Sequence, residues 1–404
     1  MPLFSSRTSR RPRIAPALDD EGLARVLGRL GKRGGSGRAP DVALVSAALE
    51  EAGHDWDRRG HRASVLAEAT AGTGLSAAWL GREPQNADAL LFHSWTALAR
   101  GLRDGRLEDA GQVVEQCHRA AELRPEDPLP WVVLLGVARV ERFAQNDVNA
   151  VWREATGRDR WHREAYLQML AYLSPEEGGS SAAVLDFVDV VRTRIPANAP
   201  CAAVEVTAAV RQYQGLLATG GVRAMTAGQL WDGGQVAAAL DQAAALWAKP
   251  GFFQHAAAQA DLNVLAYALC AAGRAADAHH VFQALQGVVT PWPWNVDGPA
   301  LQRFEQHQAK AERGRLAFPA LVLPPHAPQL FGPPTGNVWT ATSQTQNRPL
   351  VRSVSYDPVT GAETGRSEFA DQHPIDRAVS YGVAWHEGQL FGLANQLRSE
   401  GRRG

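Results

Sequence analysis

A helix-period pattern of apolar residues extends through most of this chain and limits what it can fold into. Between residues 41 and 314, alanine and leucine recur at i, i+3, i+4 and i+7, and Gly, Pro or Asn-Asp interrupts the pattern every ten to twenty residues. This period places apolar side chains on one face of an α-helix, and the interruptions end each helix. The pattern predicts an all-α body of antiparallel helical hairpins. The clearest predicted helices span 89–101, 107–123, 131–143, 162–173, 182–195, 236–247, 262–272 and 275–285.

The predicted helices at 262–272 and 275–285 carry the most regular motif. It consists of Leu262, Leu265, Ala266, Leu269, Gly273, Ala278, Phe282 and Pro291. Small side chains at 266 and 278 allow two helices to approach closely, and Phe282 fills the space beside them. The spacing resembles the tetratricopeptide repeat, in which W-x2-L-G-x2-Y on one helix is followed by A-x3-F on the next helix and then by Pro.

Related motifs occur earlier in the chain. Alanines at the position of Ala278 recur at Ala110, Ala150, Ala183 and Ala239, and successive alanines are 40, 33, 56 and 39 residues apart. The segment 119–125, RAAELRP, is the most similar to the family. We therefore predict a degenerate tetratricopeptide-like α-solenoid over residues 41–314. The alternative is an irregular all-helical domain, because such motifs arise easily in an alanine-rich chain.

The resemblance implies a superhelix whose concave face, lined by the first helix of each hairpin, binds a peptide or a partner protein. Stacked hairpins leave an extended groove, which suits interaction better than catalysis. The sequence thus predicts a non-enzymatic protein–protein interaction scaffold. The groove residues expected in this register are Asp88, Leu91, Trp95, Val132, Arg139, Asn263 and Tyr267.

Trp292 and Trp294 lie in a PWPW segment after the last predicted hairpin. Prolines fix this segment, so a single helix interface cannot enclose both indole rings. We predict that one ring is an exposed anchor for a partner, since tryptophan is enriched at the centres of interfaces. The alternative is that both rings cover the open end of the helical array.

Two regions flank the helical body. Residues 1–40 form a basic head with nine basic and three acidic side chains, and its helix-period segment is capped by Asp19. Residues 315–337 are rich in proline and are expected to form a linker. Residues 338–404 are expected to form a small β-containing C-terminal region, with strands at 338–343, 350–356 and 362–369 and a turn at 357–361.

Charge and apolar content exclude several classes of function. The formal net charge of the 404 residues is -1, so the chain has no overall field that would attract nucleic acid or an anionic membrane. We find neither an apolar run of about 20 residues nor a secretory signal, and we expect a cytoplasmic protein. The excess of Arg over Lys is typical of a GC-rich bacterial genome, such as that of an actinobacterium.

The segment HDWDRRGH contains the best candidate for a metal site. His54, Asp57 and His61 are spaced i, i+3 and i+7, on one helix face, and these residue types bind zinc. Three arginines nearby favour instead an ion-pair cluster that includes Arg58 and Arg62. Because no established catalytic motif occurs, we expect neither a cofactor nor enzymatic activity. The alternative is an enzyme whose site lies at this cluster or between the helical body and the C-terminal region.

Overall fold

A computed structural model describes residues 11–33, 38–317, 337–343, 349–356 and 363–370. The chain divides into two compact units, Met1–Phe318 and Pro319–Gly404. Within the described residues the first unit is helical apart from two short strands, which confirms the expected all-α class. No helix in these ranges is long and apolar enough to cross a bilayer.

The elements of the first unit are β1 (Arg13–Ile14), α1 (Glu21–Arg33), α2 (Ala39–Ala52), α3 (Trp56–Thr70), α4 (Leu75–Arg82), α5 (Ala87–Asp104), α6 (Ala110–Leu123), α7 (Leu129–Val140), α8 (Gln145–Arg158), α9 (Arg163–Leu173), α10 (Ser181–Arg194), α11 (Val204–Thr219), α12 (Gly221–Thr226), α13 (Gly234–Leu246), α14 (Ala258–Ala271), α15 (Ala275–Leu285), β2 (Val288–Val289), α16 (Pro291–Trp294) and α17 (Ala300–Ala317). Two 3-10 helices, Pro175–Glu177 and Ala227–Asp232, lie between them. Each helix predicted from the apolar period is present.

Glycine ends two of the helices at the predicted turns. Gly105 follows α5 with φ +74°, and Gly273 lies between α14 and α15 with φ +73°, a region that favours residues without a Cβ. Ala266, Ala278 and Phe282 are buried where α14 and α15 pack together, so the predicted hairpin is confirmed. Gly234, by contrast, is the first residue of α13.

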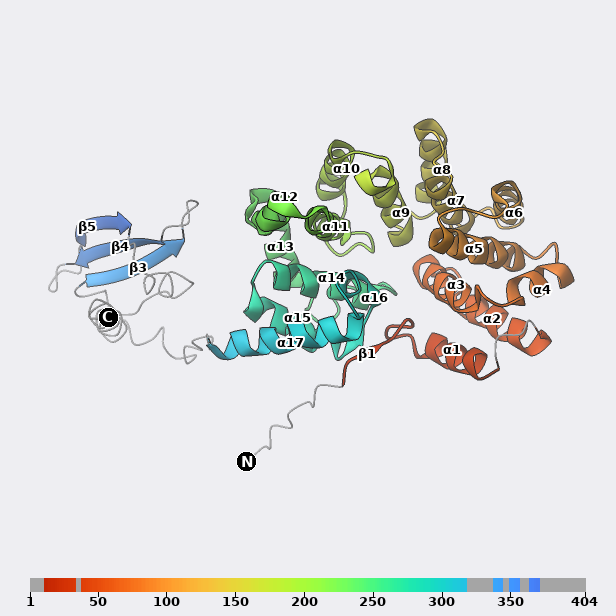
Figure 1. The fold of residues 1–404 in the computed structure, drawn as a ribbon, viewed down its shortest axis with the longest axis horizontal. Coiled ribbons are helices and arrows are strands. Elements are labelled where there is room, and N and C mark those ends of the chain that lie inside the picture. The colour runs from red at the N-terminus through yellow and green to blue at the C-terminus, as the bar shows by residue number, and fades with distance from the viewer. Residues whose placement is uncertain (1–10, 34–37, 318–336, 344–348, 357–362, 371–404) are drawn as a thin grey trace, which may run out of the picture. The chain divides into compact units, whose positions relative to one another are not determined.

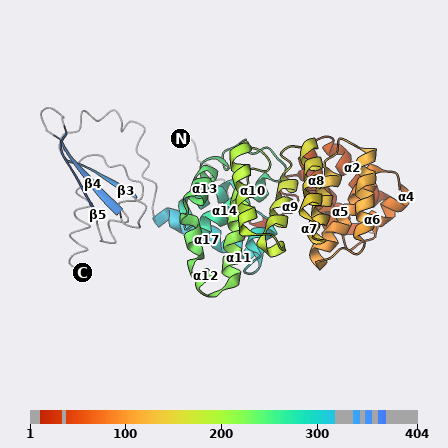
Figure 2. The same cartoon turned by 90° about the horizontal axis from the view of Figure 1, so that it is seen from above.

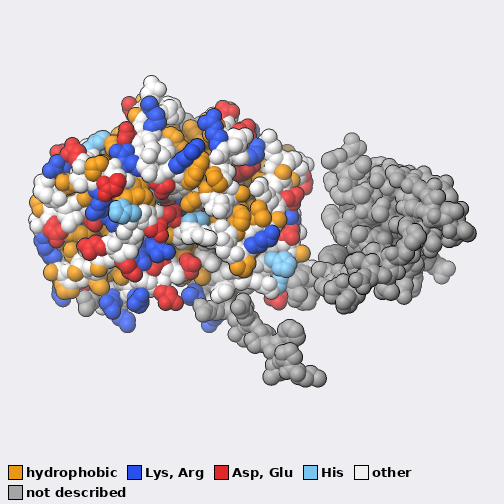
Figure 3. Space-filling model, turned by 180° about the vertical axis from the view of Figure 1, so that it is seen from behind, with side chains coloured by type: hydrophobic (Ala, Val, Ile, Leu, Met, Phe, Trp, Pro, Cys, Tyr) orange, Lys and Arg blue, Asp and Glu red, His pale blue; other side chains and the backbone are white. Residues whose placement is uncertain are grey.

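Alternate helices contact one another in succession. Helices α3, α5, α7, α9, α11 and α14 pack side by side in that order, while α6, α8, α10, α13 and α15 pack against them. Figures 1 and 2 show the helices following one another from α4 near one end of this unit to α13 near the other. On the face shown in Figure 3, apolar, basic and acidic side chains are interspersed.

The interior contains two large apolar cores. The first is formed by α1–α9 and includes Trp79 and Phe92, and the second is formed by α11–α17 and includes Trp294 and Phe304. A smaller core around Leu170 and Val204 lies between α9, α10 and α11. Burial of these apolar side chains stabilises the folded unit.

The N-terminal segment reaches the last helices of the unit. β1 pairs in parallel with β2, where Arg13 lies opposite Val288 and Ile14 opposite Val289. After β1, Leu18 packs against Ala257 and Val288. This segment therefore joins α1, the first helix, to the α14–α15 hairpin near the other end of the unit (Figure 1).

The second unit contains β3 (Asn337–Ser343), β4 (Pro349–Tyr356) and β5 (Glu363–Ala370). They form an antiparallel sheet in the order β3-β4-β5, with Thr340 opposite Arg352 and Ser353 opposite Ser367. The turn expected at 357–361, most of the linker expected at 315–337, and residues 371–404 lie outside the described residues.

Candidate binding site

The structure places most of the predicted groove residues in the interior. Leu91, Trp95 and Val132 belong to the first apolar core, and Tyr267 belongs to the second. Asp88 and Asn263 are buried as well, and Arg139 is half-buried. A partner cannot reach buried side chains without repacking the helices. These positions therefore do not line an open surface within the described chain.

The polar members of this set bind other parts of the protein. Asn263 donates to the carbonyl oxygens of Gln259 and Val288, and its Oδ1 accepts from Trp294 Nε1 at 2.9 Å. Arg139 donates to Gln168 Oε1 at 2.7 Å and to Glu177 Oε2. These hydrogen bonds satisfy buried polar groups and explain the polar residues on the inner helices.

The two tryptophans of the PWPW segment differ in exposure. Trp294 is 1% exposed and lies among Tyr267, Phe282 and Phe304, so it belongs to the core rather than to a surface anchor. Trp292 is half-buried, and its Nε1 donates to Gln214 Oε1 at 3.0 Å. The side chain at 292 is thus the more accessible of the two.

The residues proposed as metal ligands do not converge. Among the described residues, no three His, Cys, Asp or Glu side chains are placed to hold a metal ion. His54 is exposed, and Asp57 Oδ2 accepts from the backbone N–H of Ala256 at 2.7 Å. Arg62 binds Asp20 and Glu51 instead of the acidic residues of its own segment.

A polar junction connects the two halves of the helical unit. Arg163 at the start of α9 donates to both carboxylate oxygens of Asp261 on α14, at 3.0 and 3.2 Å from its Nε. His255 Nε2 lies 3.2 Å from Asp261 Oδ2. Burial by itself would raise the pKa of Asp261, but the charge of Arg163 and the nearby His255 outweigh it and lower the pKa.

His61 on α3 belongs to the same junction, which we define as Asp57, His61, His162, Arg163, His255 and Asp261. Burial, and then the positive charge of Arg163, lower the pKa of His61 below its ordinary value. The Nε2 atoms of His61 and His162 are buried and have no hydrogen-bond partner among the described residues. The junction thus combines the ion pair between Arg163 and Asp261 with buried histidine nitrogens that have no partner among the described residues.

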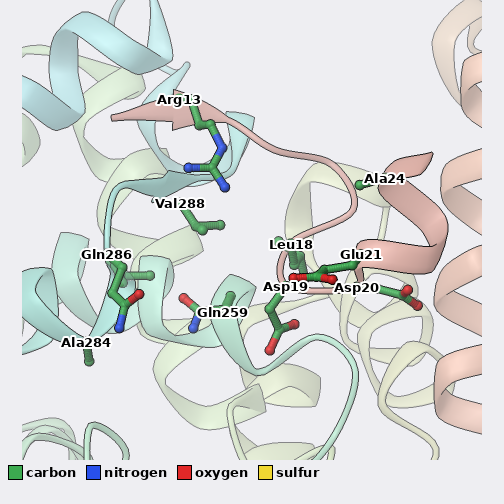
Figure 4. A pocket seen from close by; sticks show the side chains of 11 residues that line it. Arg13, Leu18, Asp19, Asp20, Glu21, Ala24, Gln259, Ala284, Gln286 and Val288 are labelled. Carbon is green, nitrogen blue, oxygen red and sulfur yellow. The ribbon is translucent and has the colours of Figure 1, made fainter. Parts of the chain in front are cut away.

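A pocket of about 380 Å³ lies between the N-terminal segment and the α14–α15 hairpin. Figure 4 shows side chains that converge on it from opposite sides. This volume is within the range of small-molecule sites. Its lining residues are Arg13, Leu18, Asp19, Asp20, Glu21, Ala24, Gln259, Ala284, Leu285, Gln286 and Val288.

The three consecutive acidic residues of the pocket differ in their availability. Asp20 accepts from Arg62 Nε at 2.7 Å and from the backbone N–H of Leu23 at 2.9 Å. Burial by itself would raise the pKa of Asp20, but these hydrogen bonds and the charge of Arg62 lower it. The exposed carboxylates of Asp19 and Glu21 form no ion pair with any described residue.

Two residues of the pocket wall have an unusual backbone conformation. Leu18 has φ +54° and Gln286 has φ +48°, and they are two of the three non-glycine residues with positive φ in the described chain. A left-handed conformation costs such residues about 1–2 kcal/mol. Such strain persists where surrounding contacts enforce it and is common at functional sites.

Sequence reasoning did not find this pocket. The sequence predicts Asp19 as the cap of the first helix, yet Asp20 is the residue whose side chain accepts a hydrogen bond from the first turn of α1, at the backbone N–H of Leu23. Gln259 and Gln286 carried no motif. The walls come from segments more than 230 residues apart, as Arg13 and Val288 illustrate, so no local spacing could connect them.

Comparison of the chain with protein-family models, with curated proteins and with solved structures finds no match. Inference about its role therefore depends on the geometry of the pocket and the junction.

Proposed function

We propose that this chain is a non-enzymatic interaction protein, built from degenerate tetratricopeptide-like hairpins, that binds a peptide or a partner protein. The partner enters the pocket between the N-terminal segment and α14–α15, rather than the face of the inner helices. The succession of contacts between alternate helices supports the repeat arrangement. Trp95 and Tyr267 are buried, so the concave groove predicted from the sequence is not open to a partner at these two residues. Substituting either residue would change the packing of the helices as well as any binding.

The observation that carries this proposal is the set of unpaired polar groups around one concave space. Asp19, Glu21 and the guanidinium of Arg13 form no ion pair with any described residue. A concave space with a few convergent polar groups that can orient a ligand is a common form of binding site. The pocket is formed where distant segments meet, so binding there would also stabilise the contact between them.

A selection from a library of short peptides with free C-termini tests the proposal on the full chain. Each selected peptide is measured again on Ala24→Trp, which places an indole at the exposed rim of the pocket, and on Ala150→Trp, an equally exposed position on α8. We expect Ala24→Trp to weaken binding at least tenfold and Ala150→Trp to leave it unchanged. Circular dichroism confirms that both variants are folded.

The proposal fails if no peptide is selected, or if every selected peptide binds Ala24→Trp as tightly as the parent chain.

A further inference from the structure

The short strand β2 is held in place from the side of α14. The side-chain amide of Asn263 donates to the carbonyl oxygen of Val288 at 3.1 Å and accepts from the backbone N–H of Thr290 at 3.4 Å. Val289, between them, is fully buried in the second apolar core. One edge of β2 is thus fixed by α14, and the position of β2 does not depend on β1.

The opposite edge of β2 receives residues 11–18, which we call the N-terminal arm. The backbone N–H of Arg13 donates to the carbonyl oxygen of Gly287 at 2.9 Å, and that of Ala15 donates to the carbonyl oxygen of Val289 at 3.2 Å. Proteins that bind peptides by strand addition use this same backbone pairing between an extended segment and the edge of a strand. The N-terminal arm therefore shows which kind of segment this edge accepts.

The N-terminal arm is attached to β2 by a small and strained contact. The strand pair is two residues long, and the buried apolar residues beside it are Leu18, Ala257 and Val288. Leu18 has φ +54° because the chain turns at once toward α1, and L-residues with a Cβ rarely adopt this conformation. A segment of another protein does not have to make this turn, so it can add to β2 without the strained residue.

The surface beneath the arm is covered by the arm itself. Ala257 and Val288 are 5% and 7% exposed, and Leu18 packs on both. If the arm leaves, their apolar surface and the edge carbonyl oxygens of β2 become open to a ligand. The pocket of about 380 Å³ begins at Leu18 and Val288 and extends to the start of α1 (Figure 4). The edge of β2 and the pocket can thus form one continuous site.

We propose that an extended segment of a partner protein binds by replacing the N-terminal arm on β2, so that the arm is an internal competitor of the ligand. The partner segment supplies N–H donors at the positions of Arg13 and Ala15 and an apolar side chain at that of Leu18. This inference rests on the proposed function and specifies the form of its ligand. The arm lowers the apparent affinity, because only molecules with an open edge can bind.

Fluorescence anisotropy of a labelled peptide tests this edge on the full chain. The peptide contains residues 11–18, RPRIAPAL, with acetylated and amidated ends. N-methylation at Ala15 removes the donor to Val289 and should weaken binding about tenfold. N-methylation at Ile14 is the matched control and should leave binding unchanged. The N–H of Ile14 points away from β2, because successive N–H groups of a strand point to opposite edges.

A variant of the full chain tests the competition. Leu18→Asn removes the apolar contact of the arm with Ala257 and Val288, and asparagine tolerates positive φ at this turn. We expect this variant to bind the peptide about tenfold more tightly than the parent chain does. Leu185→Asn, at a side chain on α10 that is 55% exposed, is the control and should bind as the parent chain does. Circular dichroism confirms that both variants are folded.

The inference is overturned if the peptide does not bind the Leu18→Asn chain, or if the two N-methylated peptides bind equally. If peptides selected from the library depend on Ala24 while the arm peptide does not bind, the proposed function stands and this assignment alone is wrong. If the arm peptide binds and no library peptide depends on Ala24, the edge accepts only this chain's own arm, and both proposals fail. Dimers of the parent chain that the arm peptide dissociates would make a second copy the occupant and would also overturn the assignment.

Discussion

Asp88 shows how a polar residue on an inner helix serves the interior. Its carboxylate, buried on α5, accepts from Arg59 on α3 and from Arg124 at the end of α6. Asp127 lies 3.6 Å from the Nε of the same Arg59, and burial raises its pKa. Two carboxylates and two guanidinium groups therefore hold three helices together. A charge in the first turn of a helix can equally serve a surface, so sequence alone did not distinguish these roles.

Replacing Asp88 with alanine should lower the free energy of unfolding by about 3–5 kcal/mol, because it leaves Arg59 buried with Asp127 as its remaining acidic partner. Urea unfolding of both chains measures the difference. Glu115→Gln, at an exposed carboxylate on α6, is the control and should change stability by less than about 0.5 kcal/mol. A loss below about 1 kcal/mol for Asp88→Ala would contradict this role.

At the scale of elements, α5 and α7 depend on a close approach. Gly136 on α7 faces Leu98 on α5, and a Cβ added at 136 would lie 2.4 Å from Leu98 Cδ2. Three atoms of Leu98 lie within 3.4 Å of that position, so the whole side chain would have to move in a filled core. In α1, by contrast, a Cβ at Gly28 would meet nothing within 4 Å.

The two glycines predict opposite effects of the same substitution. Gly136→Ala should destabilise the protein by about 1–3 kcal/mol, because overpacking exceeds the gain in helix propensity. Gly28→Ala should stabilise it by up to about 1 kcal/mol, since an exposed helical site gains propensity without a clash. Thermal unfolding of both variants checks this. A stabilising Gly136→Ala would show that the helices are not in close contact.

At the scale of the whole helical unit, the two large apolar cores are connected by the polar junction. His61, Arg163 and Asp261 come from helices that are far apart in the chain but meet there. A neutral histidine beside a buried arginine is stable, whereas a protonated one places two positive charges together. The contact between the halves should therefore depend on pH.

Stability should fall as the pH is lowered from 7.5 to 5.5. The folded pKa of His61 lies below its unfolded value of about 6.5, so the unfolded chain binds more protons in the interval between the two values. The stability that neutral His61 contributes to the folded chain is fully present above about pH 6.5. It is lost as the pH falls toward the folded pKa of His61. Burial also lowers the pKa values of His93 and His307, which add to the same trend.

Urea unfolding at pH 7.5, 6.5 and 5.5 measures this loss, which is limited to about 1.4 kcal/mol per pH unit for each histidine. His61→Gln should show a smaller fall than the parent chain, and His280→Gln, at an exposed position on α15, should show the parental fall. An equal fall in the His61→Gln chain would exclude His61 as a cause.

The amino-acid sequence by itself determined the helices, most of their ends and the α14–α15 hairpin, because apolar period, glycine turns and small contact residues are local signals. Tertiary structure decided which helix faces are covered. The apolar period marks the face that a helix buries, but a distant segment can cover its polar face as well, as Arg124 does at Asp88 and α14 does at Arg163. The pocket likewise exists because β1 returns to β2, and a parallel pair of two residues each has no sequence pattern strong enough to predict.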